Sequence, residues 1–289
     1  MKTRNLLISS VTILLFLLLV LVLYVNRDLI MPGDRGETVL EDTVSVRPIG
    51  EGRPSAADES TGTMVKKKIM PPPPHSAGAP AGEKAEAAYK RLQEEVVLFF
   101  DYLDQQDYVR EYHFPQGTYR HSLGLLSKLF ARPPIVSGET KDLFVLAGNL
   151  AHFCRVIGKE DIAFVKDVLS QEEEIMESAM DLFFDWAMVQ MNTGEGGLAD
   201  SFEELYEYAA FFLNTLGGRS YLMRRDSKVR MLITYYAILI VDHAERKNLN
   251  HYGIALKPRI DLLMDDMSQF QGLEYRDRYL TVLRRIGKS

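Results

Sequence analysis

The chain has 289 residues, of which 46% are hydrophobic and 26% charged, an ordinary composition for a globular protein of one or two domains. A formal net charge of −6 argues against a nucleic-acid-binding protein that relies on bulk positive charge, so no nucleic-acid partner is expected. The single cysteine excludes an intramolecular disulfide and the paired thiolates of a zinc ribbon or an iron–sulfur site.

Residues 6–25 form an unbroken uncharged run, LLISSVTILLFLLLVLVLYV, that begins at Leu6 and ends at Val25. A helix of this length extends about 30 Å, which matches the hydrocarbon core of a bilayer. Lys2 and Arg4 would also suit a cleaved secretory signal, but the run is long for one and lacks the small residues that signal peptidase requires. We therefore expect residues 1–25 to be a short tail followed by an uncleaved, single-pass membrane anchor.

The charges that flank this run indicate its orientation. The N-terminal tail carries Lys2 and Arg4, whereas Arg27 and Arg35 follow the run among acidic residues. Segments rich in Lys and Arg tend to stay in the cytoplasm. We expect a cytoplasmic N-terminus and an extracytoplasmic domain. The bias is small, so the inverted orientation, with the domain as a cytoplasmic adaptor, stays open.

Residues 26–82 have the composition of a disordered linker. They hold eight of the twelve prolines and seven glycines, contain no Phe, Trp or Tyr, and show no hydrophobic periodicity. Such a segment buries too little apolar surface to offset the entropy of ordering its backbone. If flexible throughout, its 57 residues have a root-mean-square reach of about 40 Å.

Residues 83–289 hold 27 of the 29 aromatic residues and show helical periodicity almost throughout. Apolar stripes, prolines and glycines delimit the expected helices, which lie within residues 89–103, 118–130, 143–157, 170–189, 201–216, 231–241, 258–270 and 279–286. This pattern predicts an all-α domain of seven or eight helices. We expect a compact bundle; a short α-solenoid is the alternative, although no fixed repeat is present.

Several of these helices have specific features that can be compared with a structure. In the third, the residues expected to face the core are Leu143, Leu146, Ala147, Leu150, Phe153 and Ile157. Gly158 is expected to end that helix in a left-handed conformation, and Thr118 to cap the second helix. Ser170 and Ser201 each precede a glutamate by three positions, the spacing of a capping box that opens a helix.

The run MLITYYAILIV, residues 231–241, is apolar on all sides but too short to cross a bilayer, so we expect it to be the central buried helix. Tyr235 and Tyr236 need hydrogen-bond partners if they are buried, and Asp242 and His243 follow where the apolar run ends. These four residues are the candidate site for a polar ligand or for proton transfer. The alternative is that they only solvate the end of the helix.

Motifs for catalysis are lacking. The sequence contains no His-Glu-x-x-His, Gly-x-Ser-x-Gly, Walker or Cys-x-x-Cys motif, and no Glu-x-x-His pair of the kind that holds metals in helical bundles. Cys154 falls on the core side of its helix, where it would act as a small hydrophobic residue, and His152 is expected to be exposed. We therefore expect no metal, no cofactor and, on balance, no enzymatic activity.

Charge is unevenly distributed along the domain. Residues 139–207 carry sixteen acidic and four basic residues, whereas residues 208–289 carry fourteen basic and eight acidic ones. Two groups are candidates for binding a partner: an acidic ridge of Glu173, Glu177, Asp181 and Asp185, and a basic cluster that includes Arg224, Arg225, Lys228 and Arg230. The two halves could pair within one fold, between two subunits, or with other proteins; simple solvated faces are the alternative.

Together these features favour a single-pass, membrane-anchored protein that presents an extracytoplasmic helical domain on a long linker. Such a protein would act as an interaction or scaffold protein, for example an assembly or accessory factor of a cell-envelope complex, and would bind a protein partner or itself. The alternative function is that of a ligand-binding sensor or a helical-bundle enzyme with a pocket near Tyr235 and His243.

Overall fold

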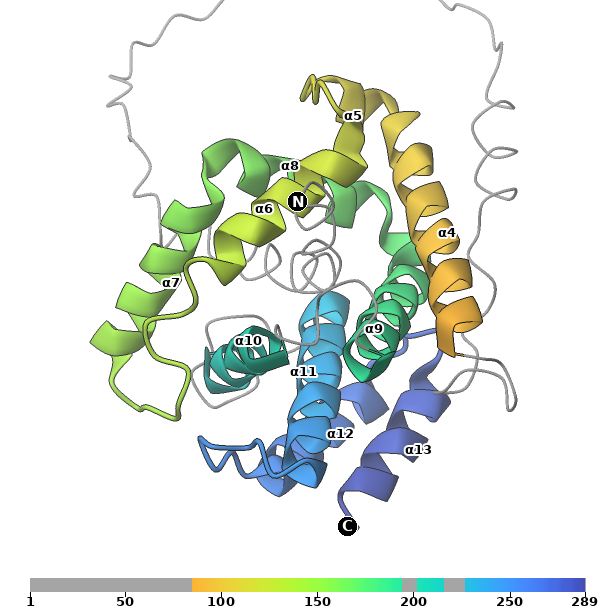
Figure 1. Ribbon diagram of the computed structural model, residues 1–289. Helices are drawn as coiled ribbons and strands as arrows, with labels where there is room; N and C mark the ends of the chain where they lie inside the picture. Colours follow the sequence, from red (N-terminus) through yellow and green to blue (C-terminus); the bar gives the residue numbers. More distant parts are fainter. Residues whose placement is uncertain (1–84, 194–201, 216–226, 289) are drawn as a thin grey trace, which may run out of the picture.

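The structure is a computed structural model, and it describes residues 85–193, 202–215 and 227–288. Every regular element in these residues is a helix (Figure 1). The elements are α4 (Ala85–Asp104), α5 (Asp107–Arg110), α6 (Gly117–Phe130), α7 (Leu143–Ile157), α8 (Lys159–Gln171), the 3-10 helix η1 (Glu173–Ile175), α9 (Met176–Thr193), α10 (Phe202–Thr215), α11 (Lys228–Arg246), α12 (Leu256–Gln269) and α13 (Arg276–Ile286).

The prediction of an all-α fold is thus confirmed for the described residues, which form a helical bundle. The predicted membrane anchor, residues 6–25, and the predicted linker, residues 26–82, lie outside the described residues. Among the described helices, none combines the length and the apolar character that a membrane span requires.

The expected number of seven or eight helices is too low, because the described residues contain ten α-helices. The short helix α5 and the whole of α8 were not anticipated. Helix α8 follows α7 after one residue, Gly158, whose φ of 94° and ψ of 157° let the chain turn sharply. The φ angle is positive, as expected, but ψ lies far from the left-handed helical region. Gly158 therefore forms a sharp bend between two helices.

Two predicted helix starts are also wrong. Ser170 lies inside the last turn of α8 instead of opening a helix, and α9 begins at Met176. Thr118 lies inside the first turn of α6, where its backbone N–H donates to Asp104 Oδ1 at 2.8 Å and its hydroxyl donates to the carbonyl oxygen of Phe100 at 3.2 Å. The capping oxygen of α6 therefore comes from the end of α4, which joins the two helices.

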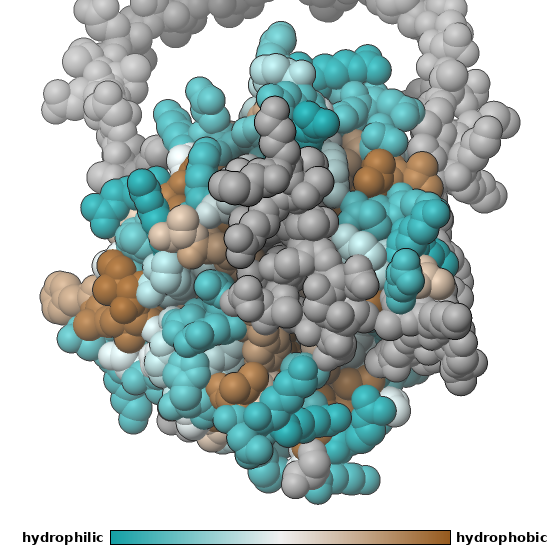
Figure 2. Space-filling model, viewed as in Figure 1, coloured by the Kyte–Doolittle hydropathy of each residue, from teal (hydrophilic) through white to brown (hydrophobic). Residues whose placement is uncertain are grey.

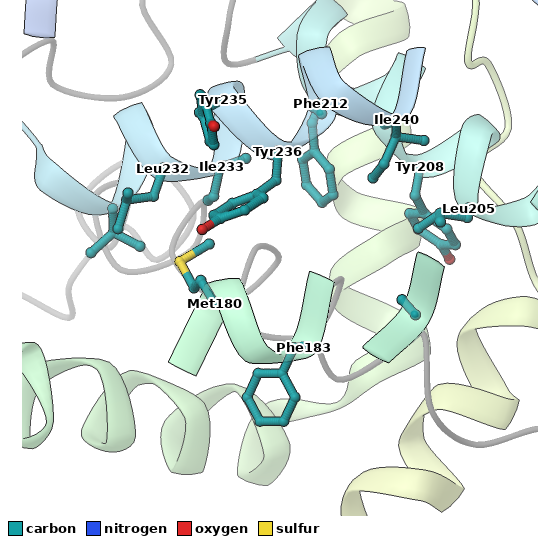
Figure 3. Packing of buried hydrophobic residues seen from close by; sticks show 14 of the residues in the cluster. Met180, Phe183, Leu205, Tyr208, Phe212, Leu232, Ile233, Tyr235, Tyr236 and Ile240 are labelled. Atoms are coloured by element: carbon teal, nitrogen blue, oxygen red, sulfur yellow. The ribbon is translucent and has the colours of Figure 1, made fainter. Parts of the chain in front are cut away.

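Helix α11 is the centre of the domain, as its sequence predicts. Every residue from 231 to 241 except Leu239 is buried. Helix α11 packs against α10, α12, α13 and α9, and α4 covers α9 on the opposite side (Figure 1). Figure 3 shows the result: Leu232, Ile233, Tyr236 and Ile240 of α11 face residues of α9 and α10, and the Tyr236 hydroxyl points toward Met180. Fully burying one such side chain contributes roughly 1.5–3 kcal/mol.

Candidate interaction face

Helix α7 lies at the edge of the bundle, where it packs on α6 and α8 (Figure 1). Its inner side is buried in the common core, and Phe153 reaches the rings of Phe211 and Phe212 on α10 at centroid distances of 5.7 and 6.5 Å. The buried residues are Leu146, Asn149, Leu150, Phe153, Val156 and Ile157. Because only this side is covered by other helices, α7 presents a complete outer side to solvent.

The outer side of α7 is apolar for most of its length. Phe144 is 90% exposed, and Ala147, Gly148, Ala151 and Arg155 are also exposed. At about 100° per residue, these five positions fall within an arc of about 100° on one side of the helix. Arg155 is the only charged residue among them. We call these five residues the α7 outer face.

One more exposed apolar side chain lies beside the α7 outer face, and another lies in the loop before the helix. Leu143, at the start of α7, is 65% exposed, and Ile135, in the preceding loop, is 63% exposed. The buried amide of Asn149 holds this loop, because its Oδ1 accepts from the backbone N–H of Ile135 at 2.7 Å and its Nδ2 donates to the carbonyl oxygen of Val136 at 2.5 Å. Figure 2 shows hydrophobic side chains gathered at the side of the molecule where α7 lies.

The start of α7 is fixed by a local cap. Asp142 Oδ1 accepts from the backbone N–H of Phe144 at 2.8 Å and from that of Val145 at 3.4 Å, which satisfies two of the free N–H groups at the helix start. The carboxylate also interacts favourably with the helix dipole. Phe144 therefore projects from an ordered first turn, and its exposure is a property of the folded helix.

Gly148 stands out within the α7 outer face. A Cβ atom added at this position would meet nothing within 4 Å. A glycine inside a helix is less favourable than alanine by about 1 kcal/mol. No contact in the described part of the chain requires a glycine here, and the same holds for Gly124 of α6.

The prediction that Leu143 and Ala147 face the core is wrong, because both are exposed. Helix α7 carries two apolar stripes, and sequence periodicity alone does not tell which one is buried. The signal for the second stripe is present in the sequence, since Phe144, Ala147, Gly148 and Ala151 recur at helical spacing. A face of this composition can bind another apolar surface, and it has no group for acid–base chemistry.

The predicted acidic ridge is used largely within the domain. Glu177 is 1% exposed, and its carboxylate accepts from the backbone N–H groups of Glu274 and Tyr275 at 2.9 and 3.0 Å. Lys228, from the predicted basic cluster, lies 2.9 Å from the same carboxylate. Glu173 is exposed, and its backbone carbonyl lies 3.4 Å from the Lys228 ammonium.

Asp181 is a second internal acceptor on α9. The Tyr236 hydroxyl donates to its Oδ1 at 2.5 Å, and the Arg278 guanidinium of α13 donates to its Oδ2. Burial raises the pKa of Asp181, and the bonds from Arg278 and Tyr236 oppose this shift. One turn later, burial together with the charge of Asp181 raises the pKa of Asp185 to about 7. Glu177 and Asp181 thus bind groups of α11, α13 and the segment before α13, whereas Glu173 is exposed.

The basic cluster is divided in the same way. Arg230 is 3% exposed and forms an ion pair with Asp266 of α12, with 2.5 Å between Nη2 and Oδ2. Arg224 and Arg225 lie outside the described residues. Of the arrangements weighed from the sequence, pairing within one fold is the one that Glu177, Asp181, Lys228 and Arg230 adopt.

The four residues of the candidate ligand site are brought together only in part. Tyr236 donates to Asp181, whereas Tyr235 packs on Tyr279 of α13 at a centroid distance of 4.6 Å. Asp242 pairs with Arg246 at 2.7 Å, and His243 packs edge-on against Phe202 of α10. Burial, with smaller effects from Lys247 and Arg246, lowers the pKa of His243. The structure thus brings the rings of Tyr235 and Tyr236 together, at a centroid distance of 5.0 Å, whereas Asp242 and His243 contact other residues.

Cys154 and His152 were also considered from the sequence. Burial raises the pKa of the Cys154 thiol to about 11, so it is not an activated nucleophile. His152 is half-buried instead of exposed, and its Nε2 is buried without a hydrogen-bond partner. Within residues 85–193, 202–215 and 227–288, no group of three or more His, Cys, Asp or Glu side chains has a geometry that could hold a metal ion.

No protein-family model, curated protein or solved structure matches the chain. The interpretation of the α7 outer face therefore depends on its own geometry and chemistry.

Proposed function

We propose that this chain is a single-pass, membrane-anchored interaction protein, an assembly or accessory factor of a cell-envelope complex, and that its helical domain binds protein through the α7 outer face. The exposed apolar surface of that helix is the observation that carries the proposal. Contiguous apolar surface rimmed by polar residues is typical of protein-binding sites, whereas single exposed apolar residues need no explanation. Phe144 and Leu143 are adjacent at the start of α7, and Phe144 is almost fully exposed.

The proposed topology follows from the sequence. Residues 6–25 anchor the chain, the N-terminus is cytoplasmic, and residues 26–82 hold the domain outside the cytoplasm at a distance of up to several tens of ångströms. A long linker suits a protein that must reach a partner in the same envelope, because it allows the α7 outer face to take any orientation relative to the membrane.

The test is crosslinking in membranes, with a C-terminally tagged full-length chain and identification of the attached proteins by mass spectrometry. Phe144→Glu places a charge in the α7 outer face and should abolish the crosslinked species. Leu98→Glu is the matched control, since Leu98 is a single exposed leucine, 56% exposed, on α4 between the exposed residues Glu94 and Asp101. Equal crosslinking of the two variants and of the wild type would exclude the α7 outer face as the binding surface.

The alternative function, a ligand-binding sensor or enzyme with a pocket at Tyr235, Tyr236, Asp242 and His243, is less well supported. The His243 Nε2 is buried without a hydrogen-bond partner, but Tyr236, Asp242 and His243 contact different neighbours.

A further inference from the structure

We propose that the domain binds a primary ammonium group between the carboxylate of Asp185 on α9 and the hydroxyl of Tyr235 on α11. The ammonium belongs either to a small amine or to a lysine side chain of a partner. Of the ligand site expected from the sequence, this site keeps only Tyr235. It is separate from the α7 outer face, so the inference goes beyond the proposed function and does not depend on it.

Asp185 lies where several helices meet. Helix α9 packs against α4 and α11, and α13 reaches α9 through the bond from Arg278 to Asp181 (Figure 1). Asp185 is half-buried. Its carboxylate is thus partly withdrawn from water, yet a small group in solution can reach it without opening the domain.

Asp185 is a charge without a counter-charge in its surroundings. The charged groups that act on it most strongly are Asp181, Arg278, Arg91 and Glu95. These four form two ion pairs: Arg278 with Asp181, and Arg91 with Glu95, with 3.0 Å between Nη1 and Oε1. No described residue forms a hydrogen bond or an ion pair with the Asp185 carboxylate. When Asp185 is ionised, the group of five therefore carries one excess negative charge.

This unpaired carboxylate opposes folding at neutral pH. Burial, followed by the charge of Asp181, raises the pKa of Asp185 to about 7. Above that pH the folded chain carries a partly buried charge without a counter-charge, which is unfavourable. Groups with such shifts are frequent in functional sites. A bound cation accounts for a carboxylate that no contact within the described residues uses.

The hydroxyl of Tyr235 is a second, independent observation. Tyr235 is only 3% exposed, and burial raises the pKa of its hydroxyl, which therefore keeps its proton. Its ring packs on those of Tyr236 and Tyr279, but no described residue forms a hydrogen bond with its hydroxyl. The adjacent Tyr236, in contrast, donates to Asp181 at 2.5 Å. Buried tyrosine hydroxyls usually have a partner, so that of Tyr235 is available to a ligand.

The carboxylate and the hydroxyl lie in one electrostatic environment. The charges that act on the Tyr235 hydroxyl are those of Arg278, Asp181, Arg285 and Asp185. Arg285 is exposed, where water and salt screen its charge, and it is not among the groups that act most strongly on Asp185. The net negative charge at Asp185 favours a cation over an anion.

A primary ammonium group matches both unpaired groups. It neutralises the Asp185 carboxylate and donates one N–H to it, and it donates a second N–H to the hydroxyl oxygen of Tyr235. An ammonium carries three donors on one small atom, whereas a guanidinium presents a wide planar fork. The small group is the better match for a hydroxyl that is almost completely buried.

The experiment uses the purified full-length chain in detergent, with propylammonium chloride as the probe. Denaturant unfolding is followed by the fluorescence of Trp186, the only tryptophan and a fully buried one. A cation that binds only the folded chain raises the midpoint of unfolding, and the dependence on concentration gives its dissociation constant. Tetramethylammonium chloride at equal concentration has the same charge but no N–H donor, so it should raise the midpoint less. Equal shifts with the two salts would overturn the inference.

Two variants locate the site. Asp185→Asn should weaken propylammonium binding at least about 10-fold, because a charge-assisted hydrogen bond is lost. Tyr235→Phe should weaken it about 2- to 10-fold, the effect of one neutral hydrogen bond. Asparagine removes an unfavourable charge and phenylalanine keeps the ring, so neither should unfold the domain. Asp277→Asn on α13 changes an exposed carboxylate and should bind as the wild type does. Wild-type affinity in Asp185→Asn would contradict the proposed site.

The pH dependence identifies the group that binds. An alkylammonium loses its proton only at about pH 10.4, as lysine does, so it stays charged at pH 6 and pH 8. With a pKa of about 7, Asp185 is about one-tenth ionised at pH 6 and about nine-tenths at pH 8. The wild type should therefore bind propylammonium roughly ten times more tightly at pH 8, and Asp185→Asn equally at both. A wild type without this dependence would exclude Asp185 as the binding group.

Crosslinking in membranes distinguishes the two sources of the ammonium. If Asp185→Asn loses a crosslinked protein that Asp277→Asn keeps, the ammonium is a lysine side chain of that protein. If both variants keep the same crosslinked proteins and only Asp185→Asn loses propylammonium binding, the ligand is a small amine. Phe144→Glu should bind propylammonium as the wild type does, so failure of the proposed function and failure of this inference are separate results.

Discussion

Arg230 of α11 and Asp266 of α12 form an ion pair in which both side chains are almost completely removed from solvent, at 4% and 5% exposure, with 2.5 Å between Nη2 and Oδ2. Taking two charges out of water is costly, and the attraction between them offsets this cost only if the geometry is good. The pair therefore gives little net stability, but removal of one partner of a buried pair is strongly destabilising.

The Asp266→Asn variant tests this relationship. It should lower the free energy of unfolding by about 3–5 kcal/mol, because the carboxylate that pairs with the buried Arg230 guanidinium is removed. Denaturant unfolding followed by Trp186 fluorescence measures the effect. Asp261→Asn, on the same helix, removes an exposed pair with Lys257 and should change stability by less than about 1 kcal/mol. The double variant Arg230→Met with Asp266→Leu should recover most of the loss; if it is as unstable as Asp266→Asn, the buried charge is not the cause.

Glu177→Gln tests the connection between α12 and α13. The carboxylate of Glu177 holds the backbone N–H groups of Glu274 and Tyr275 and pairs with Lys228. A neutral amide retains the shape but weakens these charge-assisted bonds, which are about twice as strong as neutral ones. We expect a loss of about 2 kcal/mol and faster hydrogen exchange at Glu274 and Tyr275.

Hydrogen exchange read by mass spectrometry locates this effect. Glu174→Gln is the control, since Glu174 lies three residues earlier in the chain and is exposed. Unchanged protection of residues 272–276 in the Glu177→Gln variant would show that this carboxylate does not order the segment.

Helix positions could be predicted from the sequence wherever one apolar stripe dominates. The central helix could also be predicted. Residues 231–241 are apolar on every side, and such a helix can be buried all round only at the centre of a bundle. Helix α7 shows where this reasoning fails: it is apolar on two sides, and burial of one of them depends on which helices pack there. Its outer face could be recognised only once the buried side was known.

The partners of the charged residues were beyond prediction for a related reason. Asp181 and Arg278 are separated by almost a hundred positions, and Arg230 and Asp266 by thirty-six. Local spacing indicates that charges share a helix side, but the choice of partner is made by tertiary packing. The same holds for Asp104, which caps α6 from the end of another helix.

Cys154 gives a prediction that needs no partner protein. With its pKa raised to about 11 by burial, only about 0.1% of the thiol is ionised at pH 8. Alkylation by iodoacetamide should be at least about 100-fold slower in the folded chain than in the unfolded one, and a single site makes the measurement unambiguous. Ser127→Cys in a Cys154→Ser background, on the exposed side of α6, should react at the rate of a free thiol. Equal rates at the two positions would contradict the burial of Cys154.

Asp185 should make the domain more stable at mildly acidic than at neutral pH. Its pKa is raised from 3.8 to about 7, first by burial and then by Asp181, with Glu95 adding to the shift and Arg278 and Arg91 opposing it. Between these two values the folded chain binds a proton that the unfolded chain has lost, so this residue's contribution to stability falls as the pH rises from about 4 to 7. Above pH 7 the folded carboxylate is charged, and the full free-energy cost of burying this charge opposes folding.

The Asp185→Asn variant removes this titration. It should raise the free energy of unfolding at pH 8 on the order of 2 kcal/mol, because one pKa unit corresponds to about 1.4 kcal/mol and solvent access reduces the full shift. At pH 4 the variant and the wild type should be nearly equal, since the folded wild-type side chain is then neutral. Asp277→Asn on α13, where the side chain is 95% exposed, is the control and should leave the pH dependence unchanged. A stability difference between Asp185→Asn and wild type that is the same at pH 4 and pH 8 would show that ionisation of Asp185 is not what opposes folding at neutral pH.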